Sequence, residues 1–136
     1  MINLISTAAK NFLNEQIELK SEENHESSET RTFIASIEIE LDNGETQKVF
    51  LCYDDALLRA IVDVYLGETE PDEQTLVDMA LESTNMIVGS AKMLSTTKDH
   101  FNIKTPIYEG DTRLEVTCSE EHTLFTDKDN LHIAIL

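Results

Sequence analysis

Basic residues are scarce in this chain, and their scarcity limits what it can bind. The 136 residues include 10 Lys and Arg against 27 Asp and Glu, which gives a formal net charge of −17. Such a surface repels both the phosphate backbone of nucleic acids and anionic lipid headgroups. The charge therefore excludes a simple nucleic-acid binder, argues against docking on a membrane, and favours a partner with at least one cationic feature.

Long hydrophobic runs are absent as well. No apolar stretch of the sequence approaches the roughly 18 residues that a membrane-spanning helix needs. Residues 1–6 lack the basic flank and the apolar core of a secretory signal peptide. Hydrophobic residues still make up 40% of the chain, which is enough for a core at this length. We therefore expect a single cytoplasmic domain that covers residues 1–136.

Cysteine, histidine and glycine are few, and they form no motif. Cys52 and Cys118 have no CxxC partner, so we expect two buried, reduced thiols. The four histidines do not show the spacing of metal ligands, and the four glycines form no phosphate-binding loop. The sequence thus predicts a protein with no metal and no cofactor of its own.

The spacing of apolar residues predicts an α+β domain. Helical periodicity marks three segments: 4–19, 56–66 and 71–95, the last with Pro71 in its first turn. Alternation typical of strands marks two hairpins, 32–41 with 46–53 and 113–125 with 131–136. This order predicts an antiparallel sheet built from hairpins and packed in two layers against long helices. The two helix-plus-hairpin halves also suggest a weak internal repeat.

Two further segments have a clear character. Residues 20–30 carry no apolar side chain and predict a solvated loop. The closing strand, residues 131–136, is rich in β-forming residues, and we expect it to lie at an exposed edge of the sheet.

The helix over 71–95 carries the only pattern that suggests chemistry. The residues expected on its core face are Leu76, Ala80, Ile87, Ala91 and Leu94. An opposite stripe, stepping by three or four, holds Asp78, Glu82, Asn85, Gly89 and Lys92. Asn is a poor helix-interior residue, and Gly costs about 1 kcal/mol relative to Ala. Outward Glu and Asn side chains are usually only solvated surface, but the glycine beside them leaves a flat patch that another backbone can approach.

The stretch 82–91, Glu-Ser-Thr-Asn-Met-Ile-Val-Gly-Ser-Ala, resembles the Glu-x-x-Asn signature of the CheC/CheX/FliY phosphatases of bacterial chemotaxis. Asp78 matches the acidic or hydroxyl residue that often precedes the signature by four, and Pro106 and Gly110 also fit the family's pattern. CheC-like members carry two such motifs. The first helix here offers only Asn-x-x-Asn at 11–14, so the chain is more similar to CheX, which has one motif.

The resemblance implies a CheX-like domain that hydrolyses the aspartyl phosphate of a phosphorylated CheY-type receiver, which holds Mg²⁺ in its own pocket. Asn85 would orient the attacking water, and Glu82 would pair with the receiver's lysine. Asp78 and Gly89 would contact the partner, while Lys92 would either contact it or balance the charge near Glu82.

The resemblance also implies a homodimer, because CheX relatives pair through sheet strands. An alternative function is a CheX-like module that binds a receiver, or a signalling or motor complex, without useful catalysis. The Glu82 and Asn85 pair favours the enzyme over this alternative.

Overall fold

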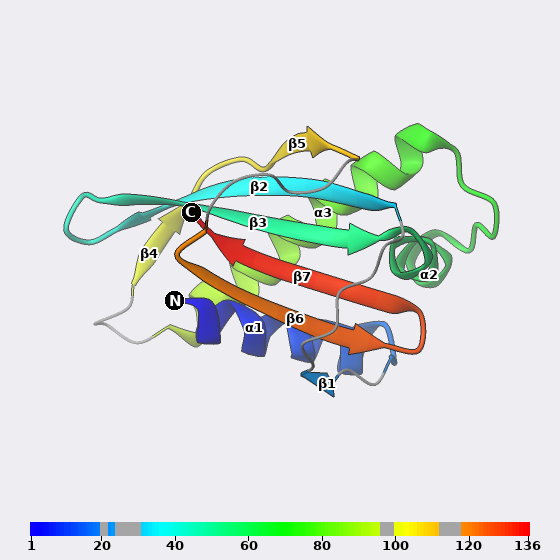
Figure 1. Ribbon diagram of the computed structural model, residues 1–136, viewed down its shortest axis with the longest axis horizontal. Coiled ribbons are helices and arrows are strands. Elements are labelled where there is room, and N and C mark those ends of the chain that lie inside the picture. The colour runs from blue at the N-terminus through cyan, green and yellow to red at the C-terminus, as the bar shows by residue number, and fades with distance from the viewer. Residues whose placement is uncertain (20–21, 24–30, 96–99, 112–117) are drawn as a thin grey trace.

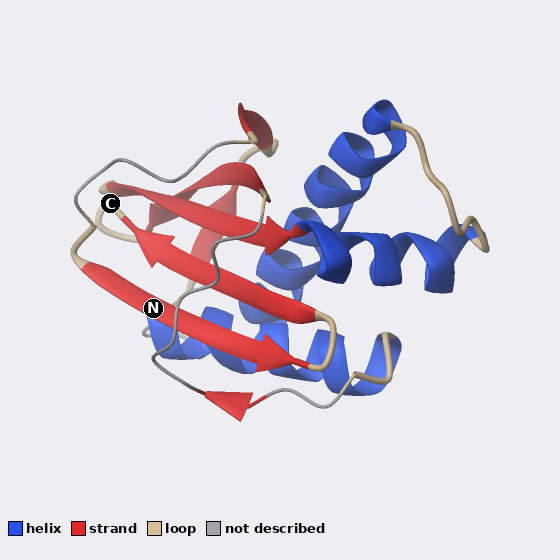
Figure 2. Ribbon diagram, turned by 45° about the vertical axis from the view of Figure 1, so that its right-hand side comes forward, coloured by secondary structure: helices blue, strands red, loops and turns tan. Residues whose placement is uncertain are grey.

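The computed structural model describes residues 1–19, 22–23, 31–95, 100–111 and 118–136. Its strands form one antiparallel sheet, and three α-helices pack against one face of it (Figures 1 and 2). The predicted α+β class and the layering of helices on a hairpin-built sheet are thereby confirmed. None of the described helices is long and apolar enough to cross a membrane.

The sheet has the strand order β1-β6-β7-β3-β2-β4, and β5 pairs with β2 on the same side as β4. The strands are β1 (Glu22–Glu23), β2 (Thr32–Leu41), β3 (Thr46–Asp54), β4 (Phe101–Ile103), β5 (Ile107–Gly110), β6 (Glu120–Thr126) and β7 (Asp129–Ile135). Both predicted hairpins, β2–β3 and β6–β7, are present, and β3 pairs with β7. Each hairpin thus places its second strand at the centre of the sheet (Figure 1).

The closing strand is not an edge, contrary to the sequence-based prediction. β7 pairs with β6 on one side and with β3 on the other. Its residues Leu131, Ile133 and Ile135 are buried in the main core, and Ala134 is buried on the opposite face. The β-forming composition of this strand therefore reflects burial on both faces in the middle of a sheet.

Two other predicted segments, one loop and one strand, differ from the structure in their extent. The stretch 20–30, predicted as a loop, contains β1, which pairs with Leu124 and Phe125 of β6; residues 20–21 and 24–30 lie outside the described part. The predicted strand 113–125 is a strand from Glu120 onward, while residues 112–117 lie outside the described part.

The helices are α1 (Ile2–Asn11), α2 (Asp55–Leu66) and α3 (Glu73–Leu94), and a π-helical turn, Phe12–Gln16, follows α1 directly. The first predicted helix, 4–19, therefore starts earlier and ends in this turn. α3 starts after Asp72, whose carboxylate accepts a hydrogen bond from the Thr75 backbone at 2.8 Å. Pro71 lies before this cap and outside the helix, because Asp72 is the residue whose side chain accepts from a free N–H group of the first turn, that of Thr75.

One face of α3 is buried between α1 and the sheet. Leu76, Ala80, Ile87 and Ala91 are buried as predicted, whereas Leu94 is 47% exposed because the helix runs beyond the core at its C-terminal end. Met79 is buried in the core, and Met86 packs against it while partly buried. Because these contacts bury one face of α3, the stripe on the opposite face stays exposed to solvent.

Only one of the two thiols is buried. Cys52 lies on the other face of the sheet in a small cluster with Ile34, Phe50 and Ala134, and burial raises its pKa to about 12. Cys118 packs against this cluster but stays half-buried. It follows β5 in the chain and precedes β6, so it is outside the strand in which the sequence placed it.

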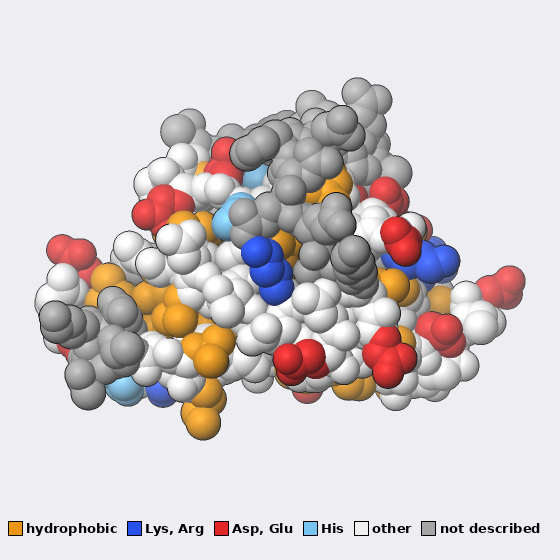
Figure 3. Space-filling model, turned by 90° about the horizontal axis from the view of Figure 1, so that it is seen from below, with side chains coloured by type: hydrophobic (Ala, Val, Ile, Leu, Met, Phe, Trp, Pro, Cys, Tyr) orange, Lys and Arg blue, Asp and Glu red, His pale blue; other side chains and the backbone are white. Residues whose placement is uncertain are grey.

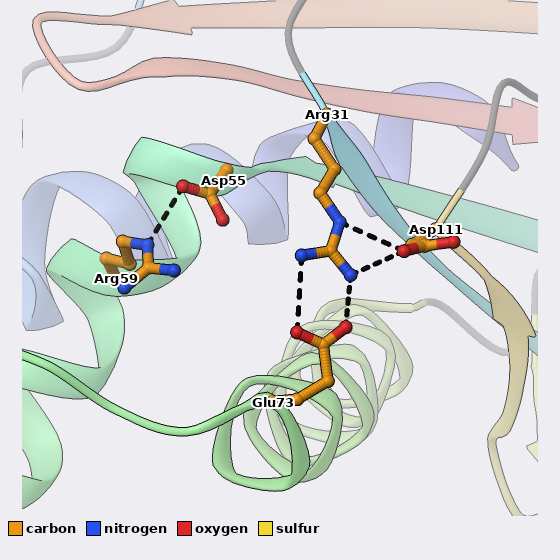
Figure 4. A network of polar contacts seen from close by, with 5 residues as sticks. All are labelled: Arg31, Asp55, Arg59, Glu73 and Asp111. Atoms are coloured by element: carbon orange, nitrogen blue, oxygen red, sulfur yellow. Dashed lines mark hydrogen bonds and ion pairs between the residues drawn. The ribbon is translucent and has the colours of Figure 1, made fainter.

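Arg31 ties the start of α3 to the end of β5 (Figure 4). Its guanidinium binds the Glu73 carboxylate through both terminal nitrogens, with Nη1 at 3.2 Å from Oε2, and its Nε lies 3.0 Å from Asp111 Oδ2. The same group stands over the Phe33 ring, 4.5 Å from its centroid. Exposed ion pairs contribute little individually. This network links the entry of α3 to the residue before β2 and the residue after β5.

Candidate functional site

A groove of about 630 Å³ separates α3 from the end of β4 and the segment that follows it. The helix wall is formed by Asp78, Leu81, Glu82 and Asn85. The facing wall is formed by Ile103, Lys104, Thr105 and Pro106. The groove thus joins three of the predicted site residues to a second segment about twenty residues further along the chain.

The three predicted residues share one face because they step by four and three along a helix. Asp78, Glu82 and Asn85 are all exposed, as the spacing predicted. Ser83 and Thr84, which lie between Glu82 and Asn85, are fully buried. The opposite face of the helix is therefore fixed in the core, and the three exposed side chains point away from it. This arrangement makes Glu82 and Asn85 accessible to a partner macromolecule.

Glu82 and Asn85 make no side-chain hydrogen bond or ion pair with any residue that the structure describes. Asp78, by contrast, accepts a hydrogen bond from Gln74 Nε2 at 2.8 Å, one turn earlier. An exposed carboxylate and an exposed amide without internal partners can bind groups from outside the protein without first breaking internal bonds.

Gly89 and Lys92 continue the stripe beyond the groove and do not line it. A Cβ atom built on Gly89 would meet nothing within 4 Å, so internal packing does not require glycine there. Lys92 Nζ donates a hydrogen bond to Asn102 Oδ1 of β4 at 3.2 Å. Lys92 therefore links the helix to the sheet, and its contact with a partner stays a prediction, as does that of Gly89.

The facing wall was not apparent from the sequence, apart from the match of Pro106 to the family pattern. Lys104 extends the pairing of β4 with β2, because its backbone N–H donates to Glu38 O at 3.0 Å. Its ammonium lies 3.2 Å from Glu38 Oε2. No spacing rule connects residues 103–106 to a helix that ends at Leu94, and only the sheet topology brings them together.

The groove is acidic, like the protein as a whole. Asp78 and Glu82 line it together with the neutral amide of Asn85, whereas the Lys104 ammonium lies against Glu38 on the sheet face opposite α3. The acidic character extends over the surface: the face seen from below in Figure 3 shows acidic side chains near its outline and few Lys or Arg. Among the described residues no His, Cys, Asp and Glu side chains gather as they would around a metal ion. The groove is thus suited to binding a charged protein surface.

The fold is the one seen in solved structures of CheX proteins. The family described as Chemotaxis phosphatase CheX matches residues 34–127, and the chain belongs to this family. No curated protein matches the chain.

Solved structures agree with this membership. The chain is similar to the chemotaxis protein CheX from Vibrio vulnificus, with a TM-score of 0.81 and 20% identity over 98% of this chain and 93% of that one. It is also similar to CheX from Desulfovibrio desulfuricans, with a TM-score of 0.78 and 19% identity over 98% and 96%. A CheX–CheY–BeF3–Mg²⁺ complex from Borrelia burgdorferi matches with a TM-score of 0.70 and 14% identity over 98% and 95%. At these identities the structures show a common fold.

Proposed function

We propose that this protein is a phosphatase that hydrolyses the aspartyl phosphate of a CheY-type receiver domain. The observation that carries the proposal is the exposed pair Glu82 and Asn85, free of internal partners and set in a groove on one face of α3. Membership of the CheX family supports the reaction, and the CheX–CheY complex from Borrelia burgdorferi supports the partner.

Each of the two residues has a separate role. The Asn85 carboxamide enters the receiver's phosphoryl site and holds a water in line with the bond that breaks. The water oxygen forms the new bond to phosphorus, the bond to the aspartate oxygen breaks, and inorganic phosphate and a free carboxylate result. Glu82 pairs with the receiver's lysine and keeps the helix in register. The Mg²⁺ belongs to the receiver substrate, so the groove needs no metal of its own.

Dephosphorylation of a Mg²⁺-loaded receiver, phosphorylated with a small phosphodonor, tests the proposal. Asn85→Ala should lower kcat about a hundredfold or more while the phosphorylated receiver still binds, because positioning acts mainly in the transition state. Asn11→Ala, an exposed amide on α1, is the matched control and should retain full activity. Equal activity of the wild type and Asn85→Ala would leave the non-catalytic binding module as the function.

Glu82→Ala should mainly weaken binding of the receiver, with a smaller loss of kcat as the helix shifts from its register. Salt should weaken the wild-type complex more than the Glu82→Ala complex, because only the wild type has this ion pair to screen. The same salt dependence in both proteins would contradict the docking role of Glu82.

We also propose that the protein is a homodimer in the cytoplasm, where receiver domains are found. Since β7 is interior, pairing through the sheet has to use another strand, and β5 carries an exposed Ile107. Light scattering should give the mass of a dimer at micromolar concentration. A monomeric mass would contradict this assembly without affecting the proposed chemistry.

A further inference from the structure

We propose that the C-terminal end of α2 is a second docking surface, which binds a protein segment that carries apolar side chains flanked by Lys or Arg. This surface, named the α2 tip, consists of residues 63–70, all of which are exposed. None of them lines the groove on α3, and the inference does not depend on the proposed phosphatase activity.

Three consecutive apolar side chains are exposed in the last turn of α2. The side chains that the helix buries all precede Asp63: Leu57, Leu58, Ile61 and Val62. Val64, Tyr65 and Leu66 follow, with exposed fractions of 51%, 39% and 53%. Successive residues of a helix point about 100° apart, so these three cover more than half of its circumference. Single exposed apolar residues are ordinary, whereas adjacent ones form a patch that a partner can cover.

The patch is held in place on one side. α2 stands at the end of the sheet where β3 finishes, and its last turn points away from the strands (Figures 1 and 2). The Tyr65 ring stacks on Phe12 with centroids 6.3 Å apart, and its hydroxyl donates a hydrogen bond to Gln16 Oε1. Tyr65 thus anchors the turn to residues 12–16, and Val64 and Leu66 on either side of it are presented on a fixed backbone.

The α2 tip and the turn that holds Tyr65 are both acidic. Neither 63–70 nor 11–18 contains Lys or Arg. Arg59, one turn earlier on α2, already binds Asp55, with its Nε 2.9 Å from Oδ2. The exposed carboxylates of the two segments are those of Asp63, Glu68, Glu70, Glu15 and Glu18.

The helix adds negative charge at the same place. Carbonyl groups at the C-terminus of a helix carry a partial negative charge, which a nearby cation stabilises. The last turn of α2 contains no basic residue, and it ends at Gly67, whose N–H donates to Asp63 O at 2.9 Å. The last turn of α3 also exposes apolar side chains, Met93 at 86% and Leu94 at 47%, but it contains Lys92. A cation from a partner is therefore favoured more at the α2 tip than at the end of α3.

These two properties, an apolar patch and an excess of negative charge, define the occupant. A second copy of this chain docked through the same patch would bring the carboxylates of both copies together. Nucleic acids and anionic lipids are repelled for the same reason. A protein segment with Leu, Ile or Met between basic residues satisfies both properties, because its apolar side chains cover Val64 and Leu66 while its cations pair with the carboxylates.

A labelled helical peptide of Leu and Lys, with all leucines on one face, is the probe, and fluorescence anisotropy with the full chain gives its Kd. A peptide of the same composition with its leucines spread around the helix should bind more weakly. Val64→Ser with Leu66→Ser should raise Kd for the first peptide about tenfold, because the apolar contact is lost. Glu68→Gln with Glu70→Gln should raise Kd less and reduce its dependence on salt.

Met93→Ser with Leu94→Ser is the matched control, because it removes the same number of exposed apolar side chains from the end of α3. Its Kd should equal that of the wild type. An equal rise in Kd in both serine double variants, or equal affinity for the two peptides, would overturn the inference, since binding would then follow the total charge alone. Urea denaturation should give wild-type stability for both variants, because all four side chains are exposed.

Two further measurements on Val64→Ser with Leu66→Ser separate the α2 tip from other interfaces. Light scattering should give the same mass as for the wild type, and a dimer that dissociates in this variant would instead show that the α2 tip joins two copies. Receiver dephosphorylation should also be unchanged, and its loss would place the α2 tip in the receiver interface. Either result would overturn the inference, whereas a wild type that binds the peptide but releases no phosphate would overturn only the phosphatase.

Discussion

The hydroxyl oxygens of Tyr53 and Thr84 lie 2.9 Å apart, and both side chains are fully buried. Tyr53 belongs to β3 at the centre of the sheet, and Thr84 directly precedes Asn85 on α3. Burial raises the pKa of Tyr53, which keeps its phenol protonated and able to donate. The hydrogen bond therefore connects the sheet to α3 at the residue next to the exposed amide and fixes the rotation of the helix about its axis.

Tyr53→Phe should destabilise the protein by about 1 kcal/mol, because the Thr84 hydroxyl loses its buried partner. Adding Thr84→Val removes that unsatisfied group, so the double variant should be more stable than the sum of the single changes predicts. Urea denaturation measures all three values. Ser83→Ala is the control: its buried hydroxyl has no hydrogen-bond partner within the described part of the chain, so its removal should be neutral or stabilising. Strictly additive effects of Tyr53 and Thr84 would show that the bond contributes nothing.

Gly89→Ala should raise stability and lower affinity for the receiver. The site is open and helical, so alanine should stabilise the helix by up to about 1 kcal/mol. The added methyl group would stand on the stripe that continues from Glu82 and Asn85, where a partner backbone would approach. Thermal unfolding and receiver binding measure the two effects. Gly67→Ala, at a φ of +67° in the helix C-cap, should instead destabilise. Unchanged affinity in Gly89→Ala would leave Gly89 outside the interface.

The N-terminal cap of α3 predicts an acid dependence of stability. Hydrogen bonds from Thr75, first its side chain and then its backbone N–H, lower the pKa of Asp72 below its usual value of 3.8. A carboxyl with a lower pKa in the folded state stabilises the protein above its unfolded pKa, and this stabilisation is lost as the pH falls through the folded value. Asp72→Ala should therefore have a lower Tm than the wild type at neutral pH. The difference between the two Tm values should become smaller in acid.

Asp72→Asn separates the cap from its charge. Asparagine is also a good cap residue but does not titrate in this range, so this variant should keep most of the Tm at neutral pH. Its Tm should also fall less than that of the wild type on acidification. A wild-type and an Asp72→Ala protein with parallel Tm profiles across the acid range would contradict the assignment.

The two cysteines should react with thiol reagents at different rates. Burial raises the pKa of the Cys52 thiol to about 12 and also raises that of Cys118, so both are almost entirely protonated at neutral pH. Cys118 is half-buried and should be alkylated first, while Cys52 should react only when the sheet opens. Mass spectrometry of the native protein at timed intervals measures this order, with Cys118→Ser as the control. Faster labelling of Cys52 would contradict the packing of its cluster.

The sequence predicted what depends on local periodicity and missed what depends on strand order. The exposed faces of Asp78, Glu82 and Asn85 follow from helical spacing, and both hairpins follow from alternation and turn residues. The interior position of β7 could not be predicted, because a strand buried on both faces and an aggregation-prone edge have the same composition. The facing wall of the groove, residues 103–106, was missed for the same reason: its place beside α3 is set by the pairing of β4 with β2, about sixty residues away in the chain.

Both walls of the groove are attached to β2, since α3 packs against this strand and Lys104 is hydrogen-bonded to it. The groove is therefore formed before any partner arrives, and association should follow a single exponential with no slow rearrangement. Its rate constant will report the total charge of −17, because this charge steers or repels a partner at a distance according to the partner's own net charge, and salt screens that effect. The rate constant of dissociation will instead report the individual ion pairs in the groove. The influence of the whole surface and that of the groove can thus be measured separately in one titration with salt.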